Sequence, residues 1–147
     1  MEALALDSSV VLTWVLQERG WQAVDTILSS GKFRLLMPGP VLTEVIYRAR
    51  SKGNASSPEH LATSLETQGL EVEVAQRQDL IVAASLYEMS QRNPRRMAVG
   101  NKAETLSLAD SLVLAISQRL GCRAVSRDSY WKWLSEEGLI NVTIVEF

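Results

Sequence analysis

Four carboxylates in this chain could together perform chemistry: Asp7, Glu44, Asp110 and Asp128. Carboxylate oxygens are the ligands that Mg²⁺ and Mn²⁺ prefer, and such a set leaves positions on the ion open for water and phosphate. A metal ion held there would lower the pKa of a bound water, neutralise phosphate oxygens and stabilise the leaving oxygen. The reaction that suits this set is hydrolysis of a phosphodiester bond, for which no histidine is required.

The physical argument is strongest for Asp110. It lies in the segment LSLADSLVLAIS, where Leu106, Val113 and Leu114 share its face of a helix at three- and four-residue spacings. A buried carboxylate is costly unless it is paired, neutralised or bound to metal, and no Lys or Arg lies between positions 102 and 119. The alternative is a capping box, in which Asp110 reaches back to Ser107 at the start of the helix.

The other three carboxylates have equally good structural explanations when each is taken alone. Asp7 and Asp128 each follow an expected strand, where an Asp also serves as a helix cap. Glu44 lies among apolar residues near the start of its helix, where the helix dipole favours a negative charge. Only their combination indicates a site.

The elements that must position these residues alternate between two periods. Strands are expected at residues 1–6, 33–37, 70–74, 123–126 and 142–147, and helices at 10–18, 21–29, 41–50, 58–68, 76–91, 107–120 and 128–135. Residues 93–102 are expected to form a basic loop. This alternation favours the α/β class, a parallel sheet with helices on both faces. In such folds ligands bind beyond the carboxyl ends of the strands, where Asp7 and Asp128 are expected.

Composition limits the remaining possibilities. The 147 residues, 46% of them hydrophobic, suffice for one domain spanning residues 1–147. A net charge of -2 gives no global attraction to nucleic acid. The single Cys122 cannot form an internal disulfide, no signal peptide is visible, and no apolar stretch approaches the roughly 20 residues of a membrane span, so a soluble, cytoplasmic protein is expected. The single histidine, His60, excludes a two-histidine nuclease and a multi-histidine zinc site.

Taken together, these pieces resemble the PIN-domain nucleases, and within them the VapC-type toxins of bacterial and archaeal toxin–antitoxin pairs. The resemblance spans nearly the whole chain. The matching pieces are the first strand ending in Asp7-Ser8-Ser9, the LTEV segment with Glu44, LSLADSLVLAIS around Asp110, and AVSRDSYW around Asp128.

The resemblance implies a sheet of strand order 3-2-1-4-5, a homodimer, and neutralisation by an antitoxin. It also implies Mg²⁺- or Mn²⁺-dependent endonucleolytic cleavage of RNA that leaves a 5′-phosphate. The family's acidic metal ligands fall on the four carboxylates, and Ser9 and Ser126 match its small hydroxyl or amide positions that orient them. The segment RNPRRMAVGNKAET is more basic and less glycine-rich than the family's pattern, which leaves the choice of RNA open.

Two basic clusters could contact RNA phosphates if they lie beside the acidic set. Arg95, Arg96 and Lys102 form the denser one, and Arg48 begins the second. Such runs are most often solvated surface, but next to a metal site they would bind phosphates on either side of the scissile one.

Two other classes of protein share the expected architecture. A receiver domain needs an acidic cluster at the first strand and an Asp after the third, but Asp7 has only Glu2 nearby and the third strand ends in LEVEVA. Neither GxGxxG nor GxxxxGK[ST] occurs, which disfavours nucleotide-binding folds. A PIN-like protein that has lost activity and only binds RNA or a partner stays open.

Overall fold

Five strands form one parallel sheet in the computed structural model, which describes residues 1–96 and 102–147. The strands are β1 (Glu2–Leu6), β2 (Phe33–Pro38), β3 (Leu70–Glu73), β6 (Arg123–Val125) and β7 (Ile144–Val145). They lie in the order β3-β2-β1-β6-β7, and each neighbouring pair is parallel. The parallel α/β sheet expected from the sequence is confirmed.

A second, two-stranded sheet corrects part of the expectation. β4 (Arg95–Arg96) and β5 (Ala103–Glu104) pair antiparallel within and just beyond the segment expected to be a basic loop. Each has two residues, too few to produce a periodic pattern. β4 and β5 come before the last two strands of the main sheet in the chain. Those last two strands are therefore β6 and β7, where the expected order 3-2-1-4-5 numbers them 4 and 5. Residues 97–101 of the expected loop lie outside the described residues.

The order of the strands reverses at β1, the central strand. From β1 the chain proceeds to β2 and β3 on one side, then crosses to β6 and β7 on the other. Leu6 pairs with Val125 in the register of β1 and β6, and the N–H of Asp7 donates to the carbonyl of Val125 at 3.0 Å. The residues that follow these two strands therefore meet at one edge of the sheet, where the open-sheet rule predicts a site.

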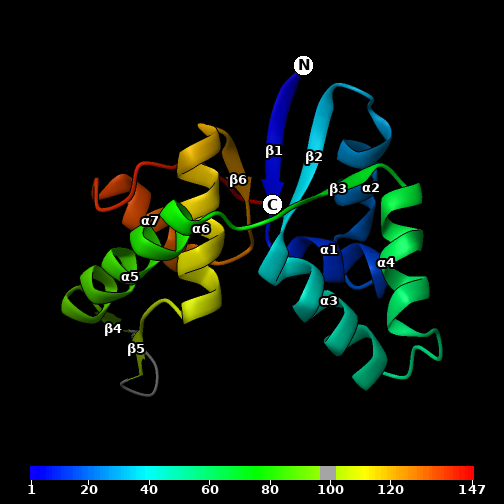
Figure 1. Cartoon of the computed structure of the whole chain (residues 1–147), viewed down its shortest axis with the longest axis horizontal. Coiled ribbons are helices and arrows are strands. Elements are labelled where there is room, and N and C mark those ends of the chain that lie inside the picture. Colours follow the sequence, from blue (N-terminus) through cyan, green and yellow to red (C-terminus); the bar gives the residue numbers. More distant parts are fainter. Residues whose placement is uncertain (97–101) are drawn as a thin grey trace.

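Helices cover both faces of the sheet, as expected (Figure 1). One side carries α1 (Ser8–Val15), α2 (Trp21–Ser29), α3 (Gly39–Ser51) and α4 (Pro58–Thr67), and the other carries α5 (Arg77–Arg92), α6 (Leu108–Leu120) and α7 (Ser129–Glu136). Parallel strands are joined by right-handed crossovers, so the direction in which the chain moves across the sheet decides which face the connecting helices cover. From β1 to β3 the chain moves one way, and from β3 to β7 it moves the other way, so the two sets of helices lie on opposite faces. Within the described ranges, no helix is long and apolar enough to cross a membrane.

The first helix differs from its expected range of residues 10–18. Asp7 caps it through the N–H of Ser8, so that α1 begins two residues earlier. It ends at Val15, and Gln17 has a positive φ of 51°, a left-handed conformation that an α-helix does not continue. This earlier start places Ser8 and Ser9 in the first turn of the helix, directly beside Asp7.

The core explains why the central strands are apolar throughout. Leu4, Ala5 and Leu6 are consecutive and all buried, because helices cover β1 from both sides. α6 packs against this core through Val113 and Leu114, which are also buried. The first turn of α6, which carries Asp110, is therefore held by the packing of the rest of the helix.

Candidate active site

Asp7 lies at the centre of the candidate site and is only 6% exposed. Its Oδ1 accepts a hydrogen bond from the N–H of Ser8 at 2.8 Å. Its Oδ2 accepts from the hydroxyls of Ser9 at 2.8 Å and Ser126 at 2.9 Å. The two serines singled out in the sequence thus both fix the orientation of this carboxylate.

The turn after β6 is attached to the turn after β1 through the same serines. The N–H of Asp128 donates to Ser126 Oγ at 3.0 Å, and that of Arg127 donates to Ser9 Oγ at 3.3 Å. Asp128 also caps α7, with its Oδ1 accepting from the N–H of Tyr130 at 2.9 Å. The capping explanation for Asp128 is therefore correct, and it leaves the second carboxylate oxygen available.

Asp110 forms the capping box that was the alternative to a functional role. Its N–H donates to Ser107 Oγ at 3.0 Å, and its Oδ2 accepts from the N–H of Ser107 at 3.3 Å. Among the described residues, however, Oδ1 accepts no hydrogen bond and no Lys or Arg forms an ion pair with this carboxylate. The capping box uses one oxygen and leaves the other free.

Glu44 reaches the site from α3. Its Oε2 accepts from the hydroxyl of Ser8 at 2.9 Å, and its Oε1 lies 3.8 Å from Nε of Arg48. The side chain is 32% exposed, so that this carboxylate stands at the rim rather than in the interior.

All four carboxylates line one cavity of about 460 Å³, hereafter the acidic pocket. The lining also includes Ser8, Ser9, Leu12, Arg48, Ser107 and Arg127. The structure therefore brings together the four acidic residues predicted from segments far apart in the chain.

Burial makes negative charge in the acidic pocket costly. Burial and, to a smaller extent, the nearby charge of Asp7 together raise the pKa of Asp110 to about 6, against hydrogen bonds from Ser107 that lower it. Burial also raises the pKa of Asp7, where the hydroxyls of Ser9 and Ser126 act in the opposite direction. It raises the pKa of Asp128 as well. A cation in the pocket would relieve this cost.

The donor chemistry of the pocket fits an ion such as Mg²⁺ or Mn²⁺. Within the described residues no group of three or more acidic, histidine or cysteine side chains is close enough together to hold a metal ion. Mg²⁺, however, is usually held by one or two carboxylates and completes its coordination with water and substrate phosphates. The free Oδ1 of Asp110, next to the buried Asp7, matches that mode of binding.

The basic residues singled out in the sequence divide into two groups. Arg48 lines the acidic pocket, whereas Arg95, Arg96 and Lys102 are not among the described residues that line it. Arg95 donates to Glu104 Oε1 through Nε at 2.9 Å and through Nη2 at 2.6 Å, and Nη2 also donates to the hydroxyl of Ser129 at 2.7 Å. Its charge is thus engaged in joining β5 to α7.

Arg127 also lines the acidic pocket, although it was not among the residues predicted from the sequence. The available signal was its position between Ser126 and Asp128, both of which were already candidates. Its contacts depend on residues remote in sequence, so that the segment alone gives no sign of how its guanidinium is held.

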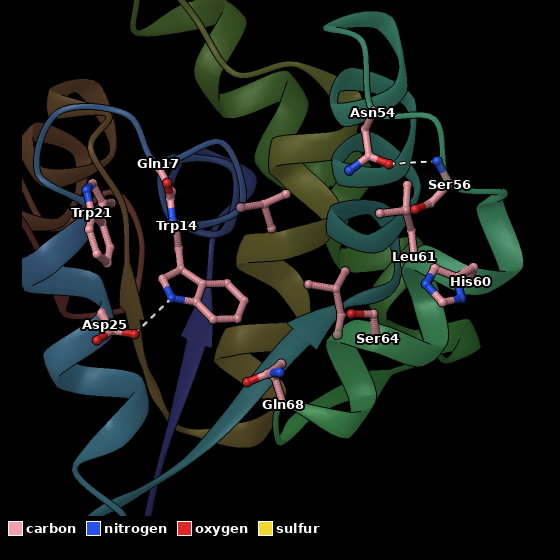
Figure 2. A pocket seen from close by; sticks show the side chains of 12 residues that line it. Trp14, Gln17, Trp21, Asp25, Asn54, Ser56, His60, Leu61, Ser64 and Gln68 are labelled. Atoms are coloured by element: carbon pink, nitrogen blue, oxygen red, sulfur yellow. Dashed lines mark hydrogen bonds between the residues drawn. The ribbon is translucent and has the colours of Figure 1, made fainter.

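A second cavity, of about 430 Å³, lies away from the carboxylates, between the end of α1, α2 and α4 (Figure 2). Trp14 and Trp21 line one side, with Trp14 Nε1 donating to Asp25 Oδ1 at 3.1 Å, and His60 and Gln68 line the other. No Lys or Arg lines this cavity among the described residues, so it offers no charge to attract phosphate.

The fold and the pocket define an α/β protein with an acidic site at the point where the strand order reverses. The sequence model of the PIN domain family matches residues 4–136, and the chain belongs to this family. No curated protein matches the chain by sequence.

Solved structures of toxin–antitoxin proteins have a similar fold. VapBC2 from Rickettsia felis, bound to a promoter DNA fragment, aligns with a TM-score of 0.65 at 14% identity, over 99% of this chain and 98% of that one. DNA-bound VapBC from Salmonella typhimurium aligns with a TM-score of 0.63 at 17% identity, over 99% and 98%. VapC20 from Mycobacterium tuberculosis, a toxin that cleaves the sarcin-ricin loop, gives 0.64 at 17% identity, over 95% and 98%.

Proposed function

We propose that this protein is a Mg²⁺- or Mn²⁺-dependent endoribonuclease, the toxin component of a cytoplasmic toxin–antitoxin pair. The observation that carries the proposal is the acidic pocket, which four carboxylates from four segments line and in which three have raised pKa values because of burial. A pocket in which burial makes the negative charge of carboxylates costly favours binding of a cation, and through the cation of a phosphate substrate.

In this mechanism Asp7 and Asp110 would hold the ion, with Glu44 and Asp128 at the rim of the pocket. When bound, such an ion would lower the pKa of a water and neutralise charge on the scissile phosphate. Ser9 and Ser126 hold Asp7 in one orientation through hydrogen bonds to its Oδ2. Glu44 and Asp128 would orient water from the rim of the pocket. No histidine lines the acidic pocket among the described residues, so solvent or a rim carboxylate would take the proton of the attacking water.

The proposed partners are an antitoxin and a second copy of the chain. VapBC complexes are among the solved structures with this fold, which supports a search for an antitoxin. A short open reading frame directly upstream that encodes a DNA-binding protein would favour the toxin assignment over a housekeeping nuclease. Co-expression with that protein should then restore growth that the present chain inhibits.

The activity itself is tested with purified protein and mixed structured RNA, with Mg²⁺, with Mn²⁺ and with EDTA. We expect cleavage only with metal, and a loss of at least about 100-fold in rate in Asp7→Asn and Asp110→Asn. Asp25→Asn in the second cavity is the matched control, since Asn keeps the acceptor for Trp14, and it should cleave like the unmodified chain.

Cleavage that does not need metal, or full activity in both variants of the acidic pocket, would contradict the proposal. Binding of RNA without cleavage under any metal condition would instead support the alternative of an inactive PIN-like protein.

A further inference from the structure

The guanidinium of Arg127 is anchored at one end by groups from distant parts of the chain. Its Nη1 donates to Thr13 Oγ1 at 3.0 Å and to the carbonyl of Arg19 at 3.4 Å. The ring of Phe147 lies against the guanidinium, with 5.2 Å between Cζ and the ring centroid, a cation–π contact. The buried Thr13 is fixed in turn, because its hydroxyl donates to the carbonyl of Ser9 at 2.7 Å. The side chain is therefore preorganised.

The other edge of the same guanidinium is unused. Within the described residues, Nε and Nη2 of Arg127 donate no hydrogen bond, and the side chain forms no ion pair. Nε and Nη2 form the parallel pair of donors that binds two oxygens of a phosphate or carboxylate at once. The residue as a whole is exposed to solvent.

The charged side chains that line the acidic pocket indicate which kind of ligand Arg127 would bind. Arg127 and Arg48 are the cationic side chains that line the acidic pocket among the described residues, and Arg48 lies 3.8 Å from the carboxylate of Glu44. Four carboxylates in the pocket repel an approaching polyanion, and of the two arginines Arg127 is the one that forms no ion pair with a described residue. A phosphodiester that enters this pocket would meet a lining arginine whose guanidinium is already held by Thr13 and Arg19.

We propose that Arg127 binds the RNA phosphate next to the scissile one, through Nε and Nη2. This inference rests on the proposed ribonuclease function and adds a substrate-binding residue to it. Its role is distinct from that of the carboxylates, since Arg127 holds the strand and Asp7 and Asp110 act at the reacting phosphate.

The test measures how salt weakens the binding of a short fluorescent single-stranded RNA to the full chain in EDTA, at 20–200 mM KCl. Removing one phosphate contact with single-stranded nucleic acid should lower the slope of log Kd against log salt by about 0.7. Arg127→Gln should show this decrease. Arg127→Lys should keep the slope and raise Kd about threefold or more, because the charge remains and the fork is lost. Thr13→Val should also keep the slope and raise Kd, because it removes one anchor of the guanidinium.

Lys32→Gln is the matched control. It removes the same charge from a position just before β2, at the opposite edge of the sheet, and should leave both slope and Kd unchanged. Melting temperatures identify any variant that fails to fold, and if Arg127→Gln does, the Lys and Val variants decide the question.

Three outcomes would each overturn the inference. They are an unchanged slope in a folded Arg127→Gln variant, Kd values equal to that of the unmodified chain in both Arg127→Lys and Thr13→Val, and no RNA binding by the unmodified chain. These outcomes concern binding in EDTA. Failure of the proposed function is recognised separately, by the absence of metal-dependent cleavage in the unmodified chain.

Discussion

Asp110 combines two roles that the sequence presented as alternatives. One carboxylate oxygen closes the capping box with Ser107, and the other accepts no hydrogen bond from the described residues at the acidic pocket. Burial and the nearby Asp7 raise its pKa to about 6, from an ordinary value of 3.8. The folded state therefore binds this proton more tightly than the unfolded state does. The stabilisation is complete below about pH 3.8 and is lost as the pH rises through about 6.

We expect Asp110→Asn to stabilise the metal-free protein at pH 7.5, by an amount on the order of 2 kcal/mol. Asn can keep the capping bond while removing the costly charge. The difference from the unmodified chain should become small near pH 4, where Asp110 is neutral as well. Thermal unfolding in EDTA at the two pH values measures the effect, and Glu66→Gln, exposed on α4, should give the same small change at both. Lower stability of Asp110→Asn than of the unmodified chain at pH 7.5 would show that burial of the charged Asp110 carboxylate does not destabilise the folded protein.

The residues of the site could be predicted to different extents. Asp7 and Asp128 were identified by their positions after strands, and Asp110 by a helix that offered no cationic partner within reach. Arg127 could not be identified in this way, because its anchors lie more than a hundred positions away in α1 and the turn after it. Long-range contacts of this kind leave no periodic or local signal.

At the scale of elements, an ion-pair network fixes the side of the sheet that carries α5 and α6. Arg119 in α6 donates through Nε to both oxygens of Asp79, each at 3.0 Å, and through Nη2 to Glu73 at the end of β3 at 2.9 Å. Asp79 is 1% exposed and also closes the capping box of α5 through the N–H of Gln76. One arginine thus connects two helices and a strand.

We expect Arg119→Met to destabilise the protein by about 3 kcal/mol or more, because it leaves the charge of Asp79 buried without a partner. Adding Asp79→Asn should recover part of this loss, since the unpaired charge is then removed. Arg123→Met is the matched control: its partner Glu2 is exposed, and the loss should stay within about 1 kcal/mol. Urea unfolding measures all three, and equal losses in the two arginine variants would contradict the expectation.

The main elements followed from periodicity, whereas the small antiparallel sheet did not. Consecutive buried residues in β1 and helical spacing in α6 reflect burial against the core, and this leaves a mark on the sequence. β4 and β5 depend instead on the pairing of Arg95 with Glu104 and on contacts with Ser129. Two strands of two residues each, held together by side-chain contacts, are too short to produce a periodic pattern of apolar residues in the sequence.

At the scale of the whole molecule, several large apolar side chains are exposed on the described surface. Tyr47 on α3 is 72% exposed, and Leu80 and Ile81, adjacent on α5, are 54% and 46% exposed. Neighbouring apolar groups in contact with water are a common feature of surfaces that bind another protein. We propose that Leu80 and Ile81 lie in the interface of the proposed homodimer.

We expect the double change Leu80→Lys and Ile81→Lys to shift the protein from dimer to monomer, because charged side chains resist burial at an interface. Sedimentation at several protein concentrations measures the shift. Gln91→Lys, exposed on the same helix, should leave the dimer intact. A monomeric unmodified chain at every concentration, or a dimeric double variant, would contradict the homodimer on this surface.

The outer strand of the sheet has a consequence for how the protein behaves at high concentration. Along β3, Glu71 and Glu73 alternate with apolar residues, and Val74 and Ala75 follow. Without these two charges the outermost strand would be a continuous apolar ribbon, able to recruit strands from other molecules into insoluble aggregates. A hydrogen bond from Arg34 holds the pKa of Glu71 below its usual range, so this strand stays charged even in mildly acidic buffer. Two glutamates outside the acidic pocket thus help to keep the protein in solution.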